Sequence, residues 1–220
     1  MGQYYLVVNI DKGEVLAADE KLIGGKLLEI AESKEKSCAL MNMITGHWKG
    51  DRVYLVGDYT DLNKENTSYH RALSEATDIL HIESSFGGIY KYANDNFTKM
   101  EADTTDHGYR FIYNHKTKQY IDILHCPECC DGTDWRQGFI SPLPLLIALG
   151  NGEGSGDYYN CDNDNLPGTW CDSVTSLEIT VEPIDELGYV EWKPDFTYPK
   201  GEWIDHMKSY FYRRKKWRWN

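Results

Sequence analysis

The chain has 220 residues, of which 41% are hydrophobic and 13% aromatic, a composition typical of a folded globular protein rather than a disordered one. Its 23 Lys and Arg against 35 Asp and Glu give a net charge of −12, which argues against nucleic acid or anionic lipid as a partner for the body of the protein. That charge either favours a cationic partner or serves solubility alone.

No apolar run approaches the roughly 20 residues of a membrane helix, and the first residues lack the basic and apolar regions of a secretion signal. We therefore expect a cytoplasmic protein without a transmembrane segment. In that compartment the six cysteines are expected to be reduced or to bind metal rather than to form disulfides.

Residues 1–60 have the pattern of one small α+β unit. A β-rich run is followed by turn residues and a second short β-rich run, which predicts a hairpin. An apolar run, a Gly-x-Trp turn and a closing strand then follow. These elements are expected at residues 4–16, 40–44, 46–48 and 53–56.

Residues 108–182 repeat this order of elements. Asn114 ends a β-rich run as Asn9 does, 105 residues earlier, and the later matching elements are at 145–149, 168–170 and 174–181. An Asp soon follows each Trp, Asp51 in one unit and Asp172 in the other, and is expected to cap a turn. We predict two diverged copies of a hairpin–helix–strand unit that form one mixed or antiparallel sheet.

Two further segments complete the expected α+β fold. In residues 61–107, the apolar spacing of 67–80 predicts a helix, and the Gly-, Asn- and Asp-rich residues 86–105 predict a linker. In residues 183–220, a strand is expected at 188–192. Trp203, Met207 and Phe211 have the spacing of one helix face and predict a C-terminal helix.

Several of these motifs resemble an uncharacterised family of mainly bacterial proteins. The shared features are the Tyr-Tyr…Val-Asn-x-Asp-Lys start at residues 4–12, the Trp-x-Gly-Asp-Arg turn at 48–52 and the Gly-Asn-Gly-x-Gly-x-Gly-Asp loop at 150–157. Glu153 stands where the family pattern has Arg, and the first unit has no such loop. The resemblance implies no activity and therefore no catalytic residues.

The Gly-rich loop is the most specific candidate for ligand binding. Gly152, Gly154 and Gly156 would let backbone N–H groups approach a phosphate, with Asp157 beside them. The loop lacks the Gly-Lys-Ser/Thr ending of a P-loop, and its carboxylates would repel a phosphate. A tightly turned connection is the alternative.

The cysteines offer a candidate zinc site. Cys126 and Cys129 form a Cys-x-x-Cys pair, and Cys161 with Cys171, or Cys130 with His125, would complete four ligands. The sequence contains no second Cys-x-x-Cys. Reduced thiols without metal and a redox pair are the alternatives.

The C-terminal residues 210–220 combine five Lys and Arg with aromatic side chains. Arg213, Arg214, Trp217 and Trp219 are therefore candidate partner-binding residues. A protein partner, single-stranded nucleic acid or a lipid surface would suit this composition, as would docking onto the acidic body of the same chain.

No complete catalytic motif is present, which favours a non-enzymatic protein. His47, Asp51 and Arg52 lie close enough in sequence for acid–base chemistry. The second unit has Thr169, Asp172 and Ser173 in their place, so packing and turn capping are favoured there. We expect an acidic protein-binding protein of the inhibitor or immunity type; the alternative is a binder or hydrolase of a nucleotide or other phosphorylated small molecule at residues 150–157.

Overall fold

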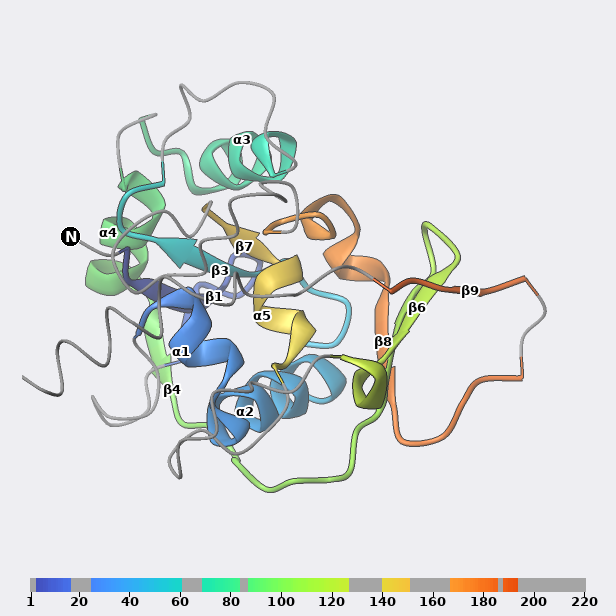
Figure 1. The fold of residues 1–220 in the computed structure, drawn as a ribbon. Coiled ribbons are helices and arrows are strands. Elements are labelled where there is room, and N and C mark those ends of the chain that lie inside the picture. The colour runs from blue at the N-terminus through green and yellow to red at the C-terminus, as the bar shows by residue number, and fades with distance from the viewer. Residues whose placement is uncertain are drawn as a thin grey trace, which may run out of the picture.

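The computed structural model describes residues 3–16, 25–60, 69–83, 87–126, 140–150, 167–185 and 188–193 (Figure 1). The fold is α+β, as predicted, but its strands form two mixed sheets rather than the single sheet expected. The first sheet has the order β4-β2-β1-β3-β7, and the second sheet has the order β8-β5-β6-β9. Among the described residues, no helix is both long enough and apolar enough to cross a membrane.

The first sheet is built around the N-terminal hairpin. Strand β1 pairs with β2 and β3 in antiparallel register, whereas β4 joins β2 and β7 joins β3 in parallel. Its strands are β1 (Tyr5–Asn9), β2 (Glu14–Leu16), β3 (Val53–Gly57), β4 (Thr98–Met100) and β7 (Ala148–Leu149).

The second sheet repeats the central pairing of the first. Strand β5 pairs with β6 and β8 in antiparallel register, as β1 does with β2 and β3, and β9 joins β6 in parallel. The strands are β5 (Phe111–Asn114), β6 (Gln119–Asp122), β8 (Leu177–Thr180) and β9 (Val190–Glu191).

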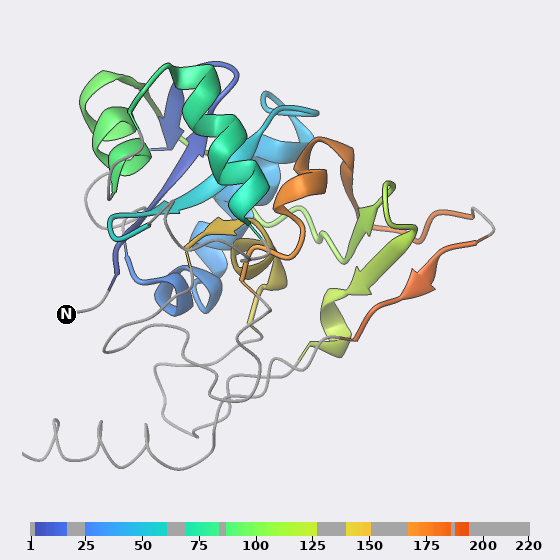
Figure 2. The same ribbon diagram turned by 90° about the horizontal axis from the view of Figure 1, so that it is seen from above.

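Helices pack between and around the sheets. Figure 1 shows the first sheet and the second sheet on opposite sides of α2 and α5, and Figure 2 shows α3 and α4 beside the first sheet. The helices are α1 (Leu27–Ala31), α2 (Lys34–Thr45), α3 (His70–Leu80), α4 (Gly88–Asn96) and α5 (Pro142–Leu146), with 3-10 turns η1 (Ile123–His125) and η2 (Cys171–Ser176).

A single hydrophobic core joins the two sheets. Trp48 and Trp170 are buried in it, with 0% and 2% of their surface exposed. Only one face of the second sheet contributes side chains to this core, among them Ile112, Ile121 and Ile179. Because neighbouring residues of a strand point to opposite sides, the other side chains of these strands face away from the core.

The expected linker at 86–105 is wrong, because the segment contains α4 and β4. Ile89, Ala93 and Phe97 recur at helical spacing and are buried, so the apolar stripe outweighs the Gly, Asn and Asp content of the segment. The apolar run 145–149 also differs from expectation, since it ends α5 and continues as β7. The predicted C-terminal helix lies outside the described residues.

A buried asparagine ends the first strand of each hairpin. The Asn9 side chain accepts from Lys12 N and donates to Asp51, and the Asn114 side chain accepts from Lys116 N and Thr117 N and donates to Ser173. Ser173, not Asp172, therefore corresponds to Asp51, since each follows its Trp by three residues. The common origin of the two units stays a prediction.

Candidate functional site

The Gly-rich loop begins at the carboxyl end of the parallel pair β3 and β7. A Cβ atom on Gly150, whose φ is +150°, would lie 2.8 Å from Tyr5 Oη and 3.0 Å from Gln3 Nε2. Tyr5 Oη donates to Gln3 Oε1 at 2.7 Å, and both side chains are buried. The predicted ligand-binding residues Gly152, Gly154, Gly156 and Asp157 lie outside the described residues.

The described cysteines are buried thiols. Cys38, Cys126 and Cys171 are free, and burial raises the pKa of Cys126 to about 12 and that of Cys171 well above its ordinary value. Within the described ranges, no group of three His, Cys, Asp or Glu side chains is arranged to hold a metal ion. The other predicted zinc ligands, Cys129 and Cys161, lie outside those ranges, as does Cys130.

We expect native Cys126 to react slowly with alkylating reagents. A rise in thiol pKa from 9.0 to about 12 lowers the thiolate fraction at pH 8 by about three orders of magnitude, and the thiolate is the nucleophile. Peptide-level mass spectrometry after iodoacetamide treatment, with and without urea, measures this. Equal labelling of Cys126 in both conditions would contradict the buried placement.

A polar network surrounds Trp48 in the first unit. The indole Nε1 donates to Glu14 Oε2 at 2.6 Å, and His47 Nε2 lies 3.0 Å from the same oxygen. Burial opposes ionisation of Glu14, but these hydrogen bonds outweigh it and lower the pKa of Glu14. Lys12 pairs with Asp51 at 2.9 Å. Each charged group is thus engaged internally, which suits the structural role predicted for this turn.

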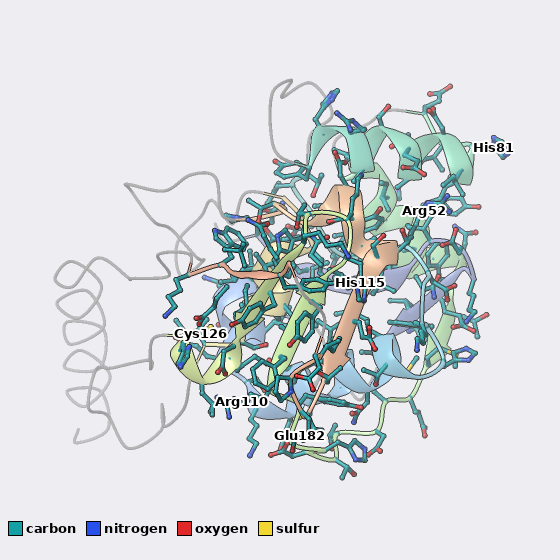
Figure 3. All side chains as sticks on the ribbon, turned by 90° about the vertical axis from the view of Figure 1, so that its right-hand side faces the viewer. Arg52, His81, Arg110, His115, Cys126 and Glu182 are labelled. Atoms are coloured by element: carbon teal, nitrogen blue, oxygen red, sulfur yellow. The ribbon has the colours of Figure 1, made fainter. Side chains whose placement is uncertain are left out.

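The outer face of the second sheet, turned away from the core, carries a cluster of aromatic rings. We define this outer face by Phe111, Tyr113, Tyr120, Glu178 and Glu191, which register places on one side of β5, β6, β8 and β9. Tyr113 and Tyr120 are stacked, with centroids 5.4 Å apart, and Phe111 lies within 6.3 Å of both. Figure 3 looks onto this side of the molecule.

The rings form a two-layered surface. Phe111 and Tyr113 are buried yet lie outside the main core cluster, whereas Tyr120 is partly exposed. Tyr189, from the segment that leads into β9, adds an edge-to-face contact with Tyr113 at 5.2 Å. Tyr113 Oη also accepts a hydrogen bond from Ile184 N, so the chain after β8 contacts the outer face as well. Packing among the rings therefore holds Tyr120 in a fixed orientation.

Charged side chains surround these rings. Arg110 donates to both carboxylate oxygens of Asp122, at 3.0 and 2.6 Å, and its guanidinium carbon lies 4.8 Å from the centroid of Phe111. His115 contacts Glu178 at 2.7 Å, and His125 contacts Glu191 at 2.5 Å. Figure 3 places Arg110 and His115 at opposite ends of β5.

The pair between Arg110 and Asp122 predicts a pH-dependent stability. The hydrogen bond from Arg110 lowers the pKa of Asp122 below its ordinary value of 3.8, against the opposing effect of burial. A carboxylate with a depressed pKa stabilises the fold above its unfolded-state pKa and loses that effect as the pH falls through the folded-state value.

We therefore expect Asp122→Asn to lower the free energy of unfolding by about 1–2 kcal/mol at pH 7, because half-exposed Arg110 loses its charged acceptor. The difference from wild type should shrink as the pH falls below 3.8. Urea unfolding at pH 7, 5, 4 and 2.5 checks this. A difference that stays constant down to pH 2.5 would refute the depressed pKa.

Exposed apolar side chains lie at the margins of the second sheet. Of the six large hydrophobic side chains exposed in the described part of the chain, Leu124 at 65% lies in η1 after β6, Val181 at 45% follows β8, and Val190 at 66% lies in the edge strand β9. Aromatic rings with exposed apolar side chains around them are typical of protein-binding surfaces.

One end of the outer face is acidic. Strand β5 begins where the antiparallel strand β8 ends, so the chain before β5 and the chain after β8 lie at the same end of the sheet. Exposed carboxylates occur in both segments, at Asp103 and Asp106, which lie beside His107 and Lys34, and at Glu182 and Asp185. We call these four residues the acidic end.

This face is not among the sites that the sequence motifs predict. Its signal is the alternation of Phe111 and Tyr113 with Ile112 and Asn114, which gives the strand an apolar residue on each side. The predicted partner-binding residues Arg213, Arg214, Trp217 and Trp219 lie outside the described residues.

Comparison of the chain with protein-family models, with curated proteins and with solved structures finds no match, so the family resemblance rests on its sequence motifs alone.

Proposed function

We propose that the chain is a non-enzymatic protein-binding protein of the inhibitor or immunity type, which acts through the outer face of the second sheet. The observation that supports this most directly is the fixed aromatic cluster around Tyr120, with paired acidic and basic side chains around it. Tyrosine and arginine are enriched at the centres of protein interfaces, because both bury much surface and retain polar contacts.

The charge of the chain supports a cationic partner. Residues 194–220 hold seven of the 23 Lys and Arg but three of the 35 Asp and Glu, so residues 1–193 have a net charge of −16. A surface of this sign speeds the approach of a basic protein and disfavours acidic ones.

Site-specific photo-crosslinking tests the proposal. A benzoylphenylalanine in place of Tyr120, in the cell that makes the protein, is expected to give one discrete adduct with another protein. The same group in place of Ile79, which is exposed on α3, provides the matched control. Adducts that are absent at 120, or the same at 79, would contradict binding through the outer face.

A second candidate is a phosphorylated small molecule bound at the start of the Gly-rich loop. It is favoured by the position of Gly150 at the carboxyl end of the parallel strands β3 and β7, the edge at which α/β sheets commonly bind ligands. A nucleotide at 100 times its Kd should add about 2.7 kcal/mol to the stability. An unchanged Tm with every nucleoside mono-, di- and triphosphate would remove this candidate.

A further inference from the structure

We infer that the outer face of the second sheet binds an arginine-rich segment of a cationic protein. This inference rests on the proposed function and specifies the chemistry of the partner. It uses two observations together, the partly exposed aromatic layer and the acidic end beside it.

The protein itself supplies an example of the contact. Arg110 lies over the ring of Phe111 while its Nε and one terminal nitrogen donate to Asp122. Lys118 approaches the ring of Tyr189 in a similar way, with Nζ 4.7 Å from the centroid. The rings of this face therefore already accept cations on their surfaces, and the neighbouring carboxylates accept from them.

In this inference a second cation binds at Tyr120 and at the exposed carboxylates Glu182 and Asp185. Tyr120 uses one side of its ring to stack on Tyr113 and is partly exposed. Glu182 and Asp185, in the segment after β8, are exposed, and Glu182 already acts on Arg110 by its charge. Figure 3 places Glu182 beyond the end of the sheet near Arg110.

Arginine suits this arrangement better than lysine does. The planar guanidinium can stack on a tyrosine ring and present its edge to a carboxylate at the same time, and it is more weakly hydrated than an ammonium group. A partner segment with several arginines would place some over Tyr120 and others against Glu182 and Asp185.

Fluorescence anisotropy with a labelled probe tests this inference. The probe is a twelve-residue peptide of alternating Arg and Ala, and the comparison peptide has Lys for Arg. With the full chain at low salt, we expect the Arg peptide to bind at least about threefold more tightly, because a guanidinium stacks on a ring while it donates to a carboxylate.

Matched variants locate the binding surface. Glu182→Gln with Asp185→Asn is expected to weaken binding of the Arg peptide about fivefold or more, through loss of two charge contacts. The control is Asp78→Asn with Glu83→Gln, which also removes two negative charges but near the end of α3. It should change the affinity for the Arg peptide by less than about twofold. Figure 3 shows His81, from that end of α3, far from Glu182.

A second pair of variants tests the ring. Tyr120→Leu should weaken binding of the Arg peptide about threefold. Tyr59→Leu, at a tyrosine outside this face that is 40% exposed, should leave the affinity unchanged. Equal affinity for the Arg and Lys peptides would overturn the inference. So would an equal loss of affinity in the variant at Glu182 and Asp185 and in the variant at Asp78 and Glu83. Crosslinking at position 120 would then still support protein binding, which separates the two failures.

The basic segment at residues 210–220 is the alternative occupant of this face. Replacement of its five Lys and Arg by Gln in the full chain should leave the Kd for the Arg peptide within about twofold. A tenfold gain in affinity would instead assign the face to that segment and overturn binding of a separate partner.

Discussion

Replacing Trp48 with alanine is expected to lower the free energy of unfolding by about 3–5 kcal/mol, and Trp170→Ala should do the same. Both indoles are almost completely buried, with 0% and 2% exposure, so each substitution leaves a large cavity in the core. Trp48→Ala also removes the donor to Glu14. Urea unfolding followed by circular dichroism measures both changes.

The matched control is Tyr59→Ala, at a side chain that is 40% exposed, and it should cost less than about 1 kcal/mol. A loss below about 1.5 kcal/mol for either Trp would show that its surroundings collapse around the smaller side chain. That outcome would contradict the equal structural importance of the two positions.

Substitution of the buried hairpin asparagines is expected to have the next largest effect. Asn9→Ala should cost about 2–3 kcal/mol, because Asp51 loses a donor and Lys12 N loses its acceptor. Asn114→Ala should cost a similar amount, because Lys116 N, Thr117 N and Ser173 lose their partner. Chemical denaturation at pH 7 is the measurement.

Asn94→Ala provides the control, because Asn94 is exposed and hydrogen-bonds its neighbour Asp95. It should change the stability by less than about 0.5 kcal/mol. Losses at Asn9 and Asn114 that differ by more than about 2 kcal/mol would argue against equivalent roles in the two units.

The sequence predicts the local elements of this fold well. Both hairpins, the helix around residues 40–44, the strand at 53–56 and the short strand at 188–192 are confirmed, because each depends on turn chemistry or apolar periodicity within one segment. The third strand of the second unit is also found, although η2 takes up the first residues of the expected run 174–181.

The arrangement of the strands could not be predicted in the same way. The parallel pairs β2 with β4 and β3 with β7 join residues 84 and 93 positions apart, at Glu14 with Thr98 and Leu55 with Ala148. Such pairings depend on the whole core rather than on local propensity. The helix α5 begins at Pro142, before the expected run, and ends at Leu146, and residues 148 and 149 then pair with β3.

The outer face of the second sheet could not be predicted from the sequence for a related reason. Phe111, Tyr113 and Tyr120 have the composition of a core, and the sequence alone does not tell which face of a strand is the inner one. Their role as an outer layer follows from register, since Ile112 and Ile121 occupy the core side. Arg110 and Asp122 pair because β5 and β6 are adjacent, which the hairpin predicts, but the position of Arg110 over the Phe111 ring depends on the three-dimensional arrangement.

Hydrogen–deuterium exchange of the protein bound to the partner captured at position 120 tests the central proposal most directly. We predict slower exchange in β5, β6 and β9, at residues 111–114, 119–122 and 190–191, and unchanged exchange in α3 and α4. Protection confined to α3 and α4, or to the edge at Gly150, would contradict binding through the outer face of the second sheet.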